Sequence, residues 1–503
     1  MDANDKCGIF AAYDSKTAAR DIYLGLHALQ HRGQEGAGIV LSQGGNDYRV
    51  HKDLGLVTNV FSEKDLRHLE KDYCGDETPT FGLGHDRYST SGEVTAANTQ
   101  PFVATHQDRV ISIAHNGDLT NAGQLKESLE EDGSVFSKSS DSEVILHKVI
   151  RADGGDPIKQ IKQGLEGVKG AFSLLFMFSE GIGAVRDPNG FRPLFVGKRE
   201  NPETSVGGTS YYFASETCAF DILGAEMIEE VPPGGGYFVS EDGLETFDIS
   251  SDTSQGLCSF EPIYFSRPDS FYNGKSIHKT RVEMGKALWE EHPVEADLVT
   301  GVPDSANSAT KGVAEAAGLP NEITLIRSHY TGRTFISPYQ SMRDLKVKKK
   351  FNLVPDTVEG QRVVLVDDSI VRGTTMKNIT QMFRECGAAE IHIRIASPPL
   401  TNPCYYGIDI PDPEELLVNR VDKEDLPEFF GADSVEYLSV ESVRETVGEE
   451  NCRACFTGNY PVEVDESERF TKDSEDTAWD EAPQANGVGP GLTHIEEPSD
   501  ADL

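Results

Sequence analysis

Two adjacent acidic residues at the end of an apolar run are the first residues here whose types and spacing could do chemistry. The run covers residues 363–366, the acids are Asp367 and Asp368, and the turn that follows contains Ser369, Arg372, Gly373, Thr374 and Thr375. The backbone N–H groups and hydroxyls of such a turn, placed before a helix, can cradle a phosphate. The two carboxylates could hold ribose hydroxyls or a Mg²⁺ ion that also touches pyrophosphate. The alternative is a capping turn rich in acidic side chains, which the Gly-Thr-Thr sequence disfavours.

This segment resembles the signature with which type I phosphoribosyltransferases bind phosphoribosyl pyrophosphate (PRPP). The resemblance implies that the acids and the turn residues contact PRPP. Upstream, Gly301-Val302-Pro303-Asp304-Ser305 is similar to the family's pyrophosphate and metal loop, which makes Ser305 a candidate Mg²⁺ ligand beside Asp367 and Asp368.

A stretch from Thr331 to Lys350 resembles the flexible catalytic loop of the same family, and it implies Arg333 and Lys350 as PRPP contacts. The stretch is a basic exception in an acidic chain, with Arg343, Lys346, Lys348, Lys349 and Lys350. A cationic lid suits a pyrophosphate leaving group. For Lys346 or Lys348 alone, a solvated helix face is the better interpretation.

A second set of motifs lies in the N-terminal half and begins with Cys7-Gly8-Ile9-Phe10. The others are His31 to Gly38, Gly84 to Thr90, Ala114 to Asn121, Ser140 to Glu143 and Arg186 to Leu194. In this order they resemble the class II (N-terminal nucleophile) glutamine amidotransferases. Joined to the PRPP signature, the resemblance narrows to the family of glutamine PRPP amidotransferases and covers residues 7–460.

Chemistry alone gives Cys7 a role, because amide hydrolysis needs a nucleophile, a base and an oxyanion site. If residues 1–6 are a propeptide that is removed, Cys7 carries a free α-amine. A reference pKa of about 7.7–8.0 lets such an amine act as base for its own thiol near neutrality. A buried apolar cysteine is the alternative, which the matching partner motifs argue against.

The resemblance also assigns partners to Cys7. Asn116 and the Gly117 backbone N–H would form the oxyanion hole. Arg87 would pair with the α-carboxylate of glutamine and Asp141 with its α-ammonium. Arg32 is also assigned to the glutamine-binding residues, as a support for the Cys7 turn. Three positions depart from the family pattern. Asp86 stands where many members have a neutral residue, Ala306 stands where Gly is usual, and Ser328-His329 stands where the family often has Asn-Arg.

Eight cysteines in the chain are too few for a disulfide scaffold. The contexts of Cys258, Cys404, Cys452 and Cys455 resemble the iron–sulfur branch of the family, which implies one [4Fe–4S] cluster per subunit with these four ligands. A C-x-x-C pair by itself serves zinc equally well. We expect Cys74, Cys218 and Cys386 to be structural.

Charge excludes some classes of function. Asp and Glu number 84 against 46 Lys and Arg, a net charge of −38, which repels nucleic acids and anionic membranes. The acids are spread along the chain, which favours a halophilic protein over an acidic interaction protein. No apolar run has membrane-spanning length and Met1 to Lys6 is polar, so a cytoplasmic location is expected.

The elements that must position these residues change character along the 503-residue chain. Up to residue 245, short apolar runs and Gly-rich turns predict mixed or antiparallel sheets with packed helices. From residue 278, strand, turn, helix and strand alternate, which predicts a doubly wound parallel sheet. The expected fold class is α/β and α+β: an N-terminal-nucleophile αββα sandwich, as the resemblance implies, followed by the phosphoribosyltransferase sheet.

The expected domains are a propeptide at 1–6, a glutaminase domain at 7–245, a phosphoribosyltransferase domain with cluster-binding flanks at 246–460, and an acidic, disordered tail at 461–503. The resemblance implies that ammonia from glutamine passes through a channel to PRPP, with one Mg²⁺ per subunit. It also implies feedback inhibition by purine nucleotides and a homotetramer. The alternatives are another class II amidotransferase, or a PRPP-binding regulatory protein that has lost catalysis.

Overall fold

The computed structural model describes residues 7–71, 78–88, 95–106, 109–152, 155–201, 208–254, 256–328 and 350–464. Several sequence predictions fall outside these residues: the propeptide 1–6, the tail from residue 465, Cys74, His329, and the basic loop from Thr331 to Lys349 with Arg333. No helix within the described ranges is long and apolar enough to cross a membrane.

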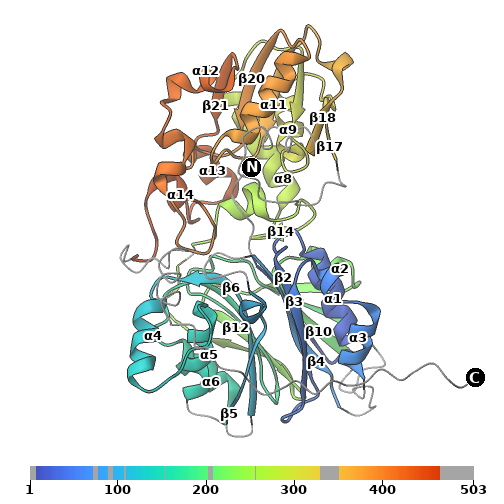
Figure 1. Cartoon of the computed structure of the whole chain (residues 1–503), viewed down its shortest axis with the longest axis vertical. Coiled ribbons are helices and arrows are strands. Elements are labelled where there is room, and N and C mark those ends of the chain that lie inside the picture. Colours follow the sequence, from blue (N-terminus) through green and yellow to red (C-terminus); the bar gives the residue numbers. More distant parts are fainter. Residues whose placement is uncertain are drawn as a thin grey trace, which may run out of the picture.

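The N-terminal half is a four-layer sandwich, with two sheets packed face to face between helices (Figure 1). The first sheet has seven strands, in the order β11 (Glu226–Glu230), β9 (Phe195–Glu200), β10 (Thr209–Ala214), β1 (Gly8–Tyr13), β4 (Phe81–Arg87), β2 (Gly36–Ser42) and β3 (Tyr48–Leu54). The second has six, in the order β13 (Gly243–Asp248), β12 (Gly235–Ser240), β8 (Gly181–Arg186), β7 (Gly170–Met177), β6 (Arg109–Leu119) and β5 (Phe102–His106).

Helices cover the outer faces of both sheets. The first sheet carries α1 (Ala18–Ala28), α2 (Val57–Val60), α3 (Glu63–Glu70) and α7 (Cys218–Asp221), and the second carries α4 (Ala122–Glu131), α5 (Asp141–Arg151) and α6 (Pro157–Leu165). Strand β1 shows how alternation builds these layers. Ile9 and Ala11 face the core between the sheets, whereas Phe10 and Ala12 face α1. The αββα sandwich is therefore confirmed.

The C-terminal half contains a four-stranded parallel sheet in the order β16 (Leu298–Gly301), β19 (Arg362–Asp367), β20 (Glu390–Ile395) and β21 (Ser434–Tyr437). Val364 and Val366 pack toward α8 (Ile277–Glu291), α9 (Asn307–Ala317) and α13 (Val440–Val447). Val363 and Leu365 pack on the other side, toward α11 (Thr374–Glu385) and α12 (Leu426–Phe430). Helices on both faces of a parallel sheet confirm the doubly wound prediction.

Smaller elements complete this half. They are β14 (Phe271–Tyr272), β15 (Lys275–Ser276), β17 (Leu325–Arg327), β18 (Phe351–Leu353) and α14 (Ala454–Thr457).

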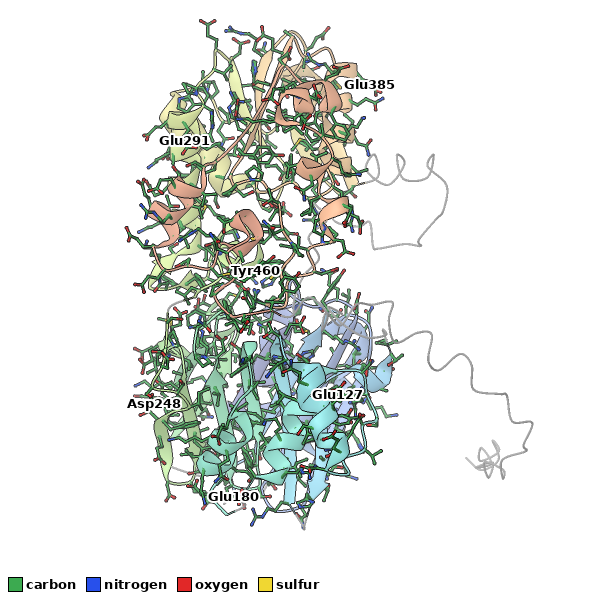
Figure 2. The ribbon with its side chains drawn as sticks, turned by 90° about the vertical axis from the view of Figure 1, so that its left-hand side faces the viewer. Glu127, Glu180, Asp248, Glu291, Glu385 and Tyr460 are labelled. Atoms are coloured by element: carbon green, nitrogen blue, oxygen red, sulfur yellow. The ribbon has the colours of Figure 1, made fainter. Side chains whose placement is uncertain are left out.

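Segments far apart in the sequence meet where the two halves join. The rings of Phe191 and Tyr406 stack with centroids 4.2 Å apart, and the Arg192 guanidinium donates from Nε and Nη2 to the Tyr406 carbonyl oxygen at 3.1 and 3.0 Å. The Tyr406 hydroxyl donates to the Val462 carbonyl oxygen at 2.8 Å. Figure 2 shows Tyr460 at this junction, and Glu127, Glu180, Asp248 and Glu385 on the outside of the molecule. Val462 and Val464 pack in the same cluster, so described residues beyond residue 460 belong to this junction.

Candidate functional site

Cys7 lies at the start of β1, beside the end of β4. Its thiol donates to the Tyr88 carbonyl oxygen at 3.5 Å. Burial raises the pKa of Cys7 to about 12; the Arg87 charge opposes that shift, while Asp86 and Asp141 add to it. The structure therefore brings Arg87 and Asp141, both predicted to bind glutamine, into the electrostatic surroundings of the predicted nucleophile.

Asn116 and Gly117 lie on β6, in the facing sheet. Asn116 is only 1% exposed, and its Nδ2 is a buried donor without a hydrogen-bond partner among the described residues. Gly117 has a φ of +155°, and a Cβ there would lie 2.0 Å from the Ala171 carbonyl oxygen, so glycine is required. The His85 imidazole Nε2 lies 3.2 Å from the His115 carbonyl oxygen, which ties the end of β4 to β6. A buried amide donor without a partner is what an oxyanion hole requires.

Asp141 begins α5 and is held as a carboxylate. Burial opposes its charge, but His115, whose Nδ1 lies 3.6 Å from Asp141 Oδ1, holds the pKa of Asp141 below its usual value. The Leu119 N–H also donates to Asp141 Oδ2 at 3.1 Å. A fixed negative charge beside Cys7 suits an ammonium ligand.

Arg32 is fully buried in a charge network that joins the two halves. Its Nε donates to Glu216, and its Nη2 donates to Glu261 Oε2 at 2.6 Å. Glu261 also accepts from Arg192 Nη1 at 3.0 Å. Because two carboxylates already engage the Arg32 guanidinium, the geometry favours the supporting role over direct contact with glutamine. Sequence reasoning missed the roles of both carboxylates: Glu216 lies in no motif singled out there, and Glu261 belongs to the sequence context of Cys258 but was given no role of its own.

The predicted PRPP residues meet at the carboxyl end of the parallel sheet. Strands β16 and β19 pair in parallel, which places the loop with Ser305 beside Asp367 and Asp368. Ser305 Oγ donates to Asp368 Oδ1 at 2.5 Å, and Ser369 Oγ donates to Asp368 Oδ2 at 2.7 Å. Gly373, with a φ of +80°, turns the chain into α11, whose first residues are Thr374 and Thr375.

Asp367 and Asp368 are adjacent in the sequence, and both are buried. Burial, and then the Asp368 charge, raise the pKa of Asp367 well above the usual value for a carboxyl. A divalent cation would remove this penalty, and carboxylate and hydroxyl oxygens are the donors that Mg²⁺ prefers. The donor set of Ser305, Asp367 and Asp368 therefore fits Mg²⁺.

Other predicted PRPP contacts are arranged differently. Arg372 Nε donates to Glu415 Oε2 at 2.9 Å, so its guanidinium is engaged beside the turn. Lys350 Nζ lies 5.3 Å from the Phe351 ring centroid.

Sequence reasoning missed Arg281, a fully buried guanidinium on which the Asp368 charge acts; burial lowers the pKa of Arg281 to about 10. No motif signals Arg281, because it lies within an ordinary amphipathic helix.

The four cysteines predicted to be cluster ligands come together at the junction. Residues 258 and 452 form a parallel β-bridge, and the Thr401 and Asn402 N–H groups donate to the Cys455 carbonyl oxygen at 3.0 and 3.1 Å. Burial, and then the charges of Cys258, Cys404 and Cys452, raise the pKa of Cys455 well above its usual value. The charge of the buried Arg192 acts on Cys258 and Cys404.

The donor chemistry of these four cysteines fits an iron–sulfur cluster, which is held by Cys thiolates. Across the described residues, no group of three or more His, Cys, Asp or Glu side chains is arranged to hold a metal ion. In a four-iron cluster each thiolate binds its own iron, so the sulfurs need not converge on one point. Thiolates at these four positions would repel one another, and the buried Arg192 cation would offset part of that repulsion, as an anionic ligand set requires.

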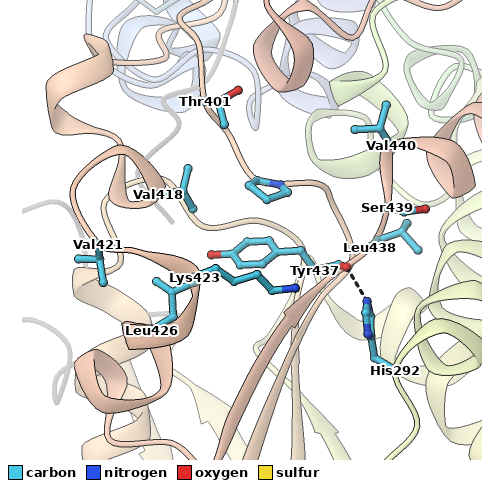
Figure 3. Close-up of a pocket in the computed structure, with 11 residues that line it drawn as sticks. His292, Thr401, Val418, Val421, Lys423, Leu426, Tyr437, Leu438, Ser439 and Val440 are labelled. Carbon is cyan, nitrogen blue, oxygen red and sulfur yellow. Dashed lines mark hydrogen bonds between the residues drawn. The ribbon is translucent and has the colours of Figure 1, made fainter.

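A separate cavity of about 490 Å³ opens beside β21 (Figure 3). Its walls are mainly apolar and include Val418, Val421 and Leu438, with His292 and Lys423 among its polar residues. None of the residues predicted to bind glutamine, PRPP or a metal lines it. The predicted catalytic chemistry therefore lies elsewhere.

Comparisons with known proteins agree with this geometry. A family model for a glutamine amidotransferase domain matches residues 85–221. An amidophosphoribosyltransferase from Bacillus subtilis (strain 168) is 44% identical over 469 residues, which cover 92% of this chain and 95% of that protein. One from Methanocaldococcus jannaschii is 43% identical over 478 residues, which cover 91% and 98%. The solved glutamine PRPP amidotransferase from B. subtilis, complexed with ADP and GMP, matches with a TM-score of 0.83 at 43% identity and covers 92% of this chain and 98% of that one.

Proposed function

The chain belongs to the amidophosphoribosyltransferase family, and from that premise we propose how its residues move nitrogen from glutamine to PRPP. Glutamine, water and PRPP give glutamate, pyrophosphate and 5-phosphoribosylamine, the first step of purine biosynthesis. The observation that carries the proposal is the grouping of Cys7 with Arg87 and Asp141, opposite a sheet that presents Asn116 Nδ2, a donor without a hydrogen-bond partner among the described residues.

In the glutamine half, the Cys7 thiol attacks the side-chain amide carbon of glutamine. The α-amine of Cys7, exposed by removal of residues 1–6, takes the thiol proton and passes it to the departing ammonia. Asn116 Nδ2 and the Gly117 N–H stabilise the oxyanion. Water then hydrolyses the thioester, which releases glutamate and restores the thiol. Arg87 and Asp141 hold the α-carboxylate and the α-ammonium of glutamine.

In the PRPP half, Ser305, Asp367 and Asp368 would hold Mg²⁺, which supplies positive charge for the pyrophosphate leaving group when bound. Residues 369–375 cradle the 5′-phosphate and ribose through backbone N–H groups and hydroxyls at the start of α11. Arg333 and Lys350 belong to the proposed cationic lid. Ammonia attacks C1 of the ribose as the C1–O bond to pyrophosphate breaks, and the excess proton leaves with solvent.

Further proposals extend this assignment. Cys258, Cys404, Cys452 and Cys455 would hold a [4Fe–4S] cluster with a structural role at the junction. Purine nucleotides are proposed inhibitors, since a solved relative is described as complexed with ADP and GMP. A cytoplasmic homotetramer adapted to high salt is proposed from the family resemblance and the net charge of −38.

The Cys7→Ala variant tests the division of labour. We expect it to lose glutamine-dependent synthesis by at least about a thousandfold, since removing a nucleophile costs that much or more. Synthesis from external ammonia should stay near wild type, because the PRPP site is separate. Cys386→Ala, at a partly buried cysteine on the C-terminal end of α11, is the matched control. Glutamine use that survives in Cys7→Ala would contradict the proposed nucleophile.

Asp367→Asn and Asp368→Asn complete the test, because both routes share PRPP. Each variant should lose glutamine-dependent and ammonia-dependent synthesis together, while Cys7 still hydrolyses glutamine. A sugar isomerase or ATP-dependent amidotransferase would show no dependence on PRPP. A PRPP-binding regulator without catalysis would form no phosphoribosylamine by either route.

A further inference from the structure

Asp86 is a fully buried carboxylic acid directly opposite the residue that follows the proposed nucleophile. Strands β1 and β4 pair so that Gly8 faces Asp86. The Gly8 N–H donates to Asp86 Oδ1 at 2.5 Å, and Asp86 itself is 0% exposed. The other carboxyl oxygen, Oδ2, is buried without a hydrogen-bond partner among the described residues. Among the residues that the structure describes, the Gly8 amide is therefore the one group outside residue 86 to which this side chain bonds.

Gly8 is matched to this arrangement. A Cβ at position 8 would lie 2.3 Å from Asp86 Oδ1, so a larger residue would displace the carboxyl. The absence of a side chain on Gly8 thus opens the space through which the acid reaches the backbone amide. Gly8 and Asp86 thus fit each other, although they are 78 residues apart in the sequence.

The surrounding charges show that this acid is not there to pair with a cation. The Arg32 guanidinium, whose charge acts on Asp86, is already engaged by Glu216 and Glu261. Burial raises the pKa of Asp86 well above its usual value, against the opposing effects of the Gly8 amide and Arg32. A neutral carboxyl still accepts through Oδ1, so the contact with Gly8 does not depend on ionisation.

The end of β4 holds the proposed nucleophile from two sides. Asp86 binds the amide on the C-terminal side of Cys7, and the Tyr88 carbonyl oxygen accepts from the Cys7 thiol at 3.5 Å. Arg87, the proposed partner of the glutamine α-carboxylate, lies between them in the sequence. Three consecutive residues thus set the position of the thiol relative to the glutamine-binding arginine.

We infer that Asp86 is a positioning residue for the nucleophile, which clamps the Cys7–Gly8 backbone through the Gly8 amide. The inference rests on the proposed function, in which Cys7 attacks glutamine. The hydrogen bond of Asp86 is to the Gly8 amide, whereas the Cys7 thiol bonds to the Tyr88 carbonyl oxygen, so the effect of Asp86 should appear in the rate of the glutamine reaction rather than in glutamine binding.

Asp86→Leu and Asp86→Asn separate the acceptor from the charge. Leucine has a similar size and no acceptor, so kcat with glutamine should fall about tenfold to a hundredfold, as a small misplacement of a reacting group does. The KM for glutamine should stay within about threefold, because Arg87 and Asp141 remain. Asparagine keeps an oxygen acceptor at the same place and should retain kcat within about threefold. Synthesis from ammonia should be unchanged in both variants.

The controls make each result decisive. Asp21→Leu removes another buried acid of the same helix–sheet layer, on α1, and should leave kcat per folded chain unchanged. Rates are expressed per mature chain, with the N-terminus verified by intact mass, so that slower processing is not read as slower catalysis. If Asp86→Leu does not fold, Asp86→Ala, which adds no apolar bulk, takes its place.

A folded Asp86→Leu variant with kcat for glutamine within about twofold of wild type would overturn the inference, since one lost positioning contact should cost more. So would an Asp86→Asn variant as impaired as Asp86→Leu, because the charge and not the acceptor would then matter. Cys7→Ala in the same assay separates this failure from failure of the proposed function. If Cys7→Ala is inactive with glutamine and Asp86→Leu is normal, only the role of Asp86 is lost.

Discussion

At the scale of single residues, the Cys7 thiol can attack glutamine efficiently only if a base accepts its proton. Burial raises the pKa of Cys7 to about 12, so at neutral pH almost none of it is thiolate. Arg87 opposes the shift but does not cancel it. A base must therefore take the proton during attack, and in the proposed mature chain that base is the α-amine of Cys7.

This requirement predicts the pH dependence of glutamine use. The α-amine acts only when neutral, so kcat/KM for glutamine should fall about tenfold per pH unit below its pKa of about 7.7–8.0 and level off above it. The measurement is a glutaminase profile from pH 6 to 10 at saturating PRPP. A rate that keeps rising through pH 10 without a plateau would show that the thiol itself titrates and that no base assists it.

Residue types in ordered motifs were enough to name the candidate residues of the site, but not the residues that support them. Asn116 and Asp141 are where the motifs place them, one as a buried donor and the other as a buried carboxylate. Glu261 could not be predicted, because it binds Arg32 from 229 residues away and no local pattern encodes that contact. Arg281 could not be predicted either, because the periodicity of its helix accounts for its position and gives no sign of its electrostatic interaction with Asp368.

At the scale of elements, the alternation of strand, turn and helix expected from residue 278 is present in β16, α9, β19 and α11. The apolar run at residues 363–366 lies within β19, which ends at Asp367. The sequence pattern could not predict how closely helices α8 and α9 approach each other. Helices α8 and α9 approach until a Cβ on Gly285 would lie 2.0 Å from the Ala309 carbonyl oxygen, and one on Gly312 would lie 2.0 Å from that of Val282.

This close approach reverses the usual effect of a helical Gly→Ala change. In an open helix, alanine is favoured over glycine by about 1 kcal/mol. In Gly312→Ala the new methyl group meets a backbone carbonyl, and overpacking of that kind costs about 1–3 kcal/mol. We expect a lower denaturation midpoint for Gly312→Ala in urea. Lys279→Ala, at an exposed position of α8, should stay within about 0.5 kcal/mol of wild type. A stabilised Gly312→Ala would show that the helices are free to separate.

At the scale of the whole molecule, the halves are joined by buried charge and by cysteines from distant segments. Arg192 belongs to both connections, because it pairs with Glu261 at 3.0 Å while its charge acts on Cys258 and Cys404. The sequence contexts predicted which cysteines belong together. They could not predict the buried cation beside them, since Arg192 lies in a motif of the glutaminase half.

The cluster proposal is therefore a prediction about stability as well as composition. Protein purified without oxygen should contain iron and inorganic sulfide in amounts that match one [4Fe–4S] cluster per chain. Oxygen should bleach the cluster and inactivate the enzyme together. Because thiolate ligation is coupled to folding, Cys404→Ala should lower the free energy of unfolding by about 4–5 kcal/mol or more, with less effect on turnover per folded molecule.

Cys386→Ala removes a thiol remote from the junction and serves as the control for cysteine loss in general. Zinc in stoichiometric amount without sulfide would replace the iron assignment and keep the four-cysteine site. Four thiols that react freely in the native protein, with neither metal present, would contradict any metal at the junction. The buried ion pairs of Glu261 would then join the halves without a cofactor. A Glu261→Ala variant should be strongly destabilised, because the buried guanidinium groups of Arg32 and Arg192 would lose their shared carboxylate.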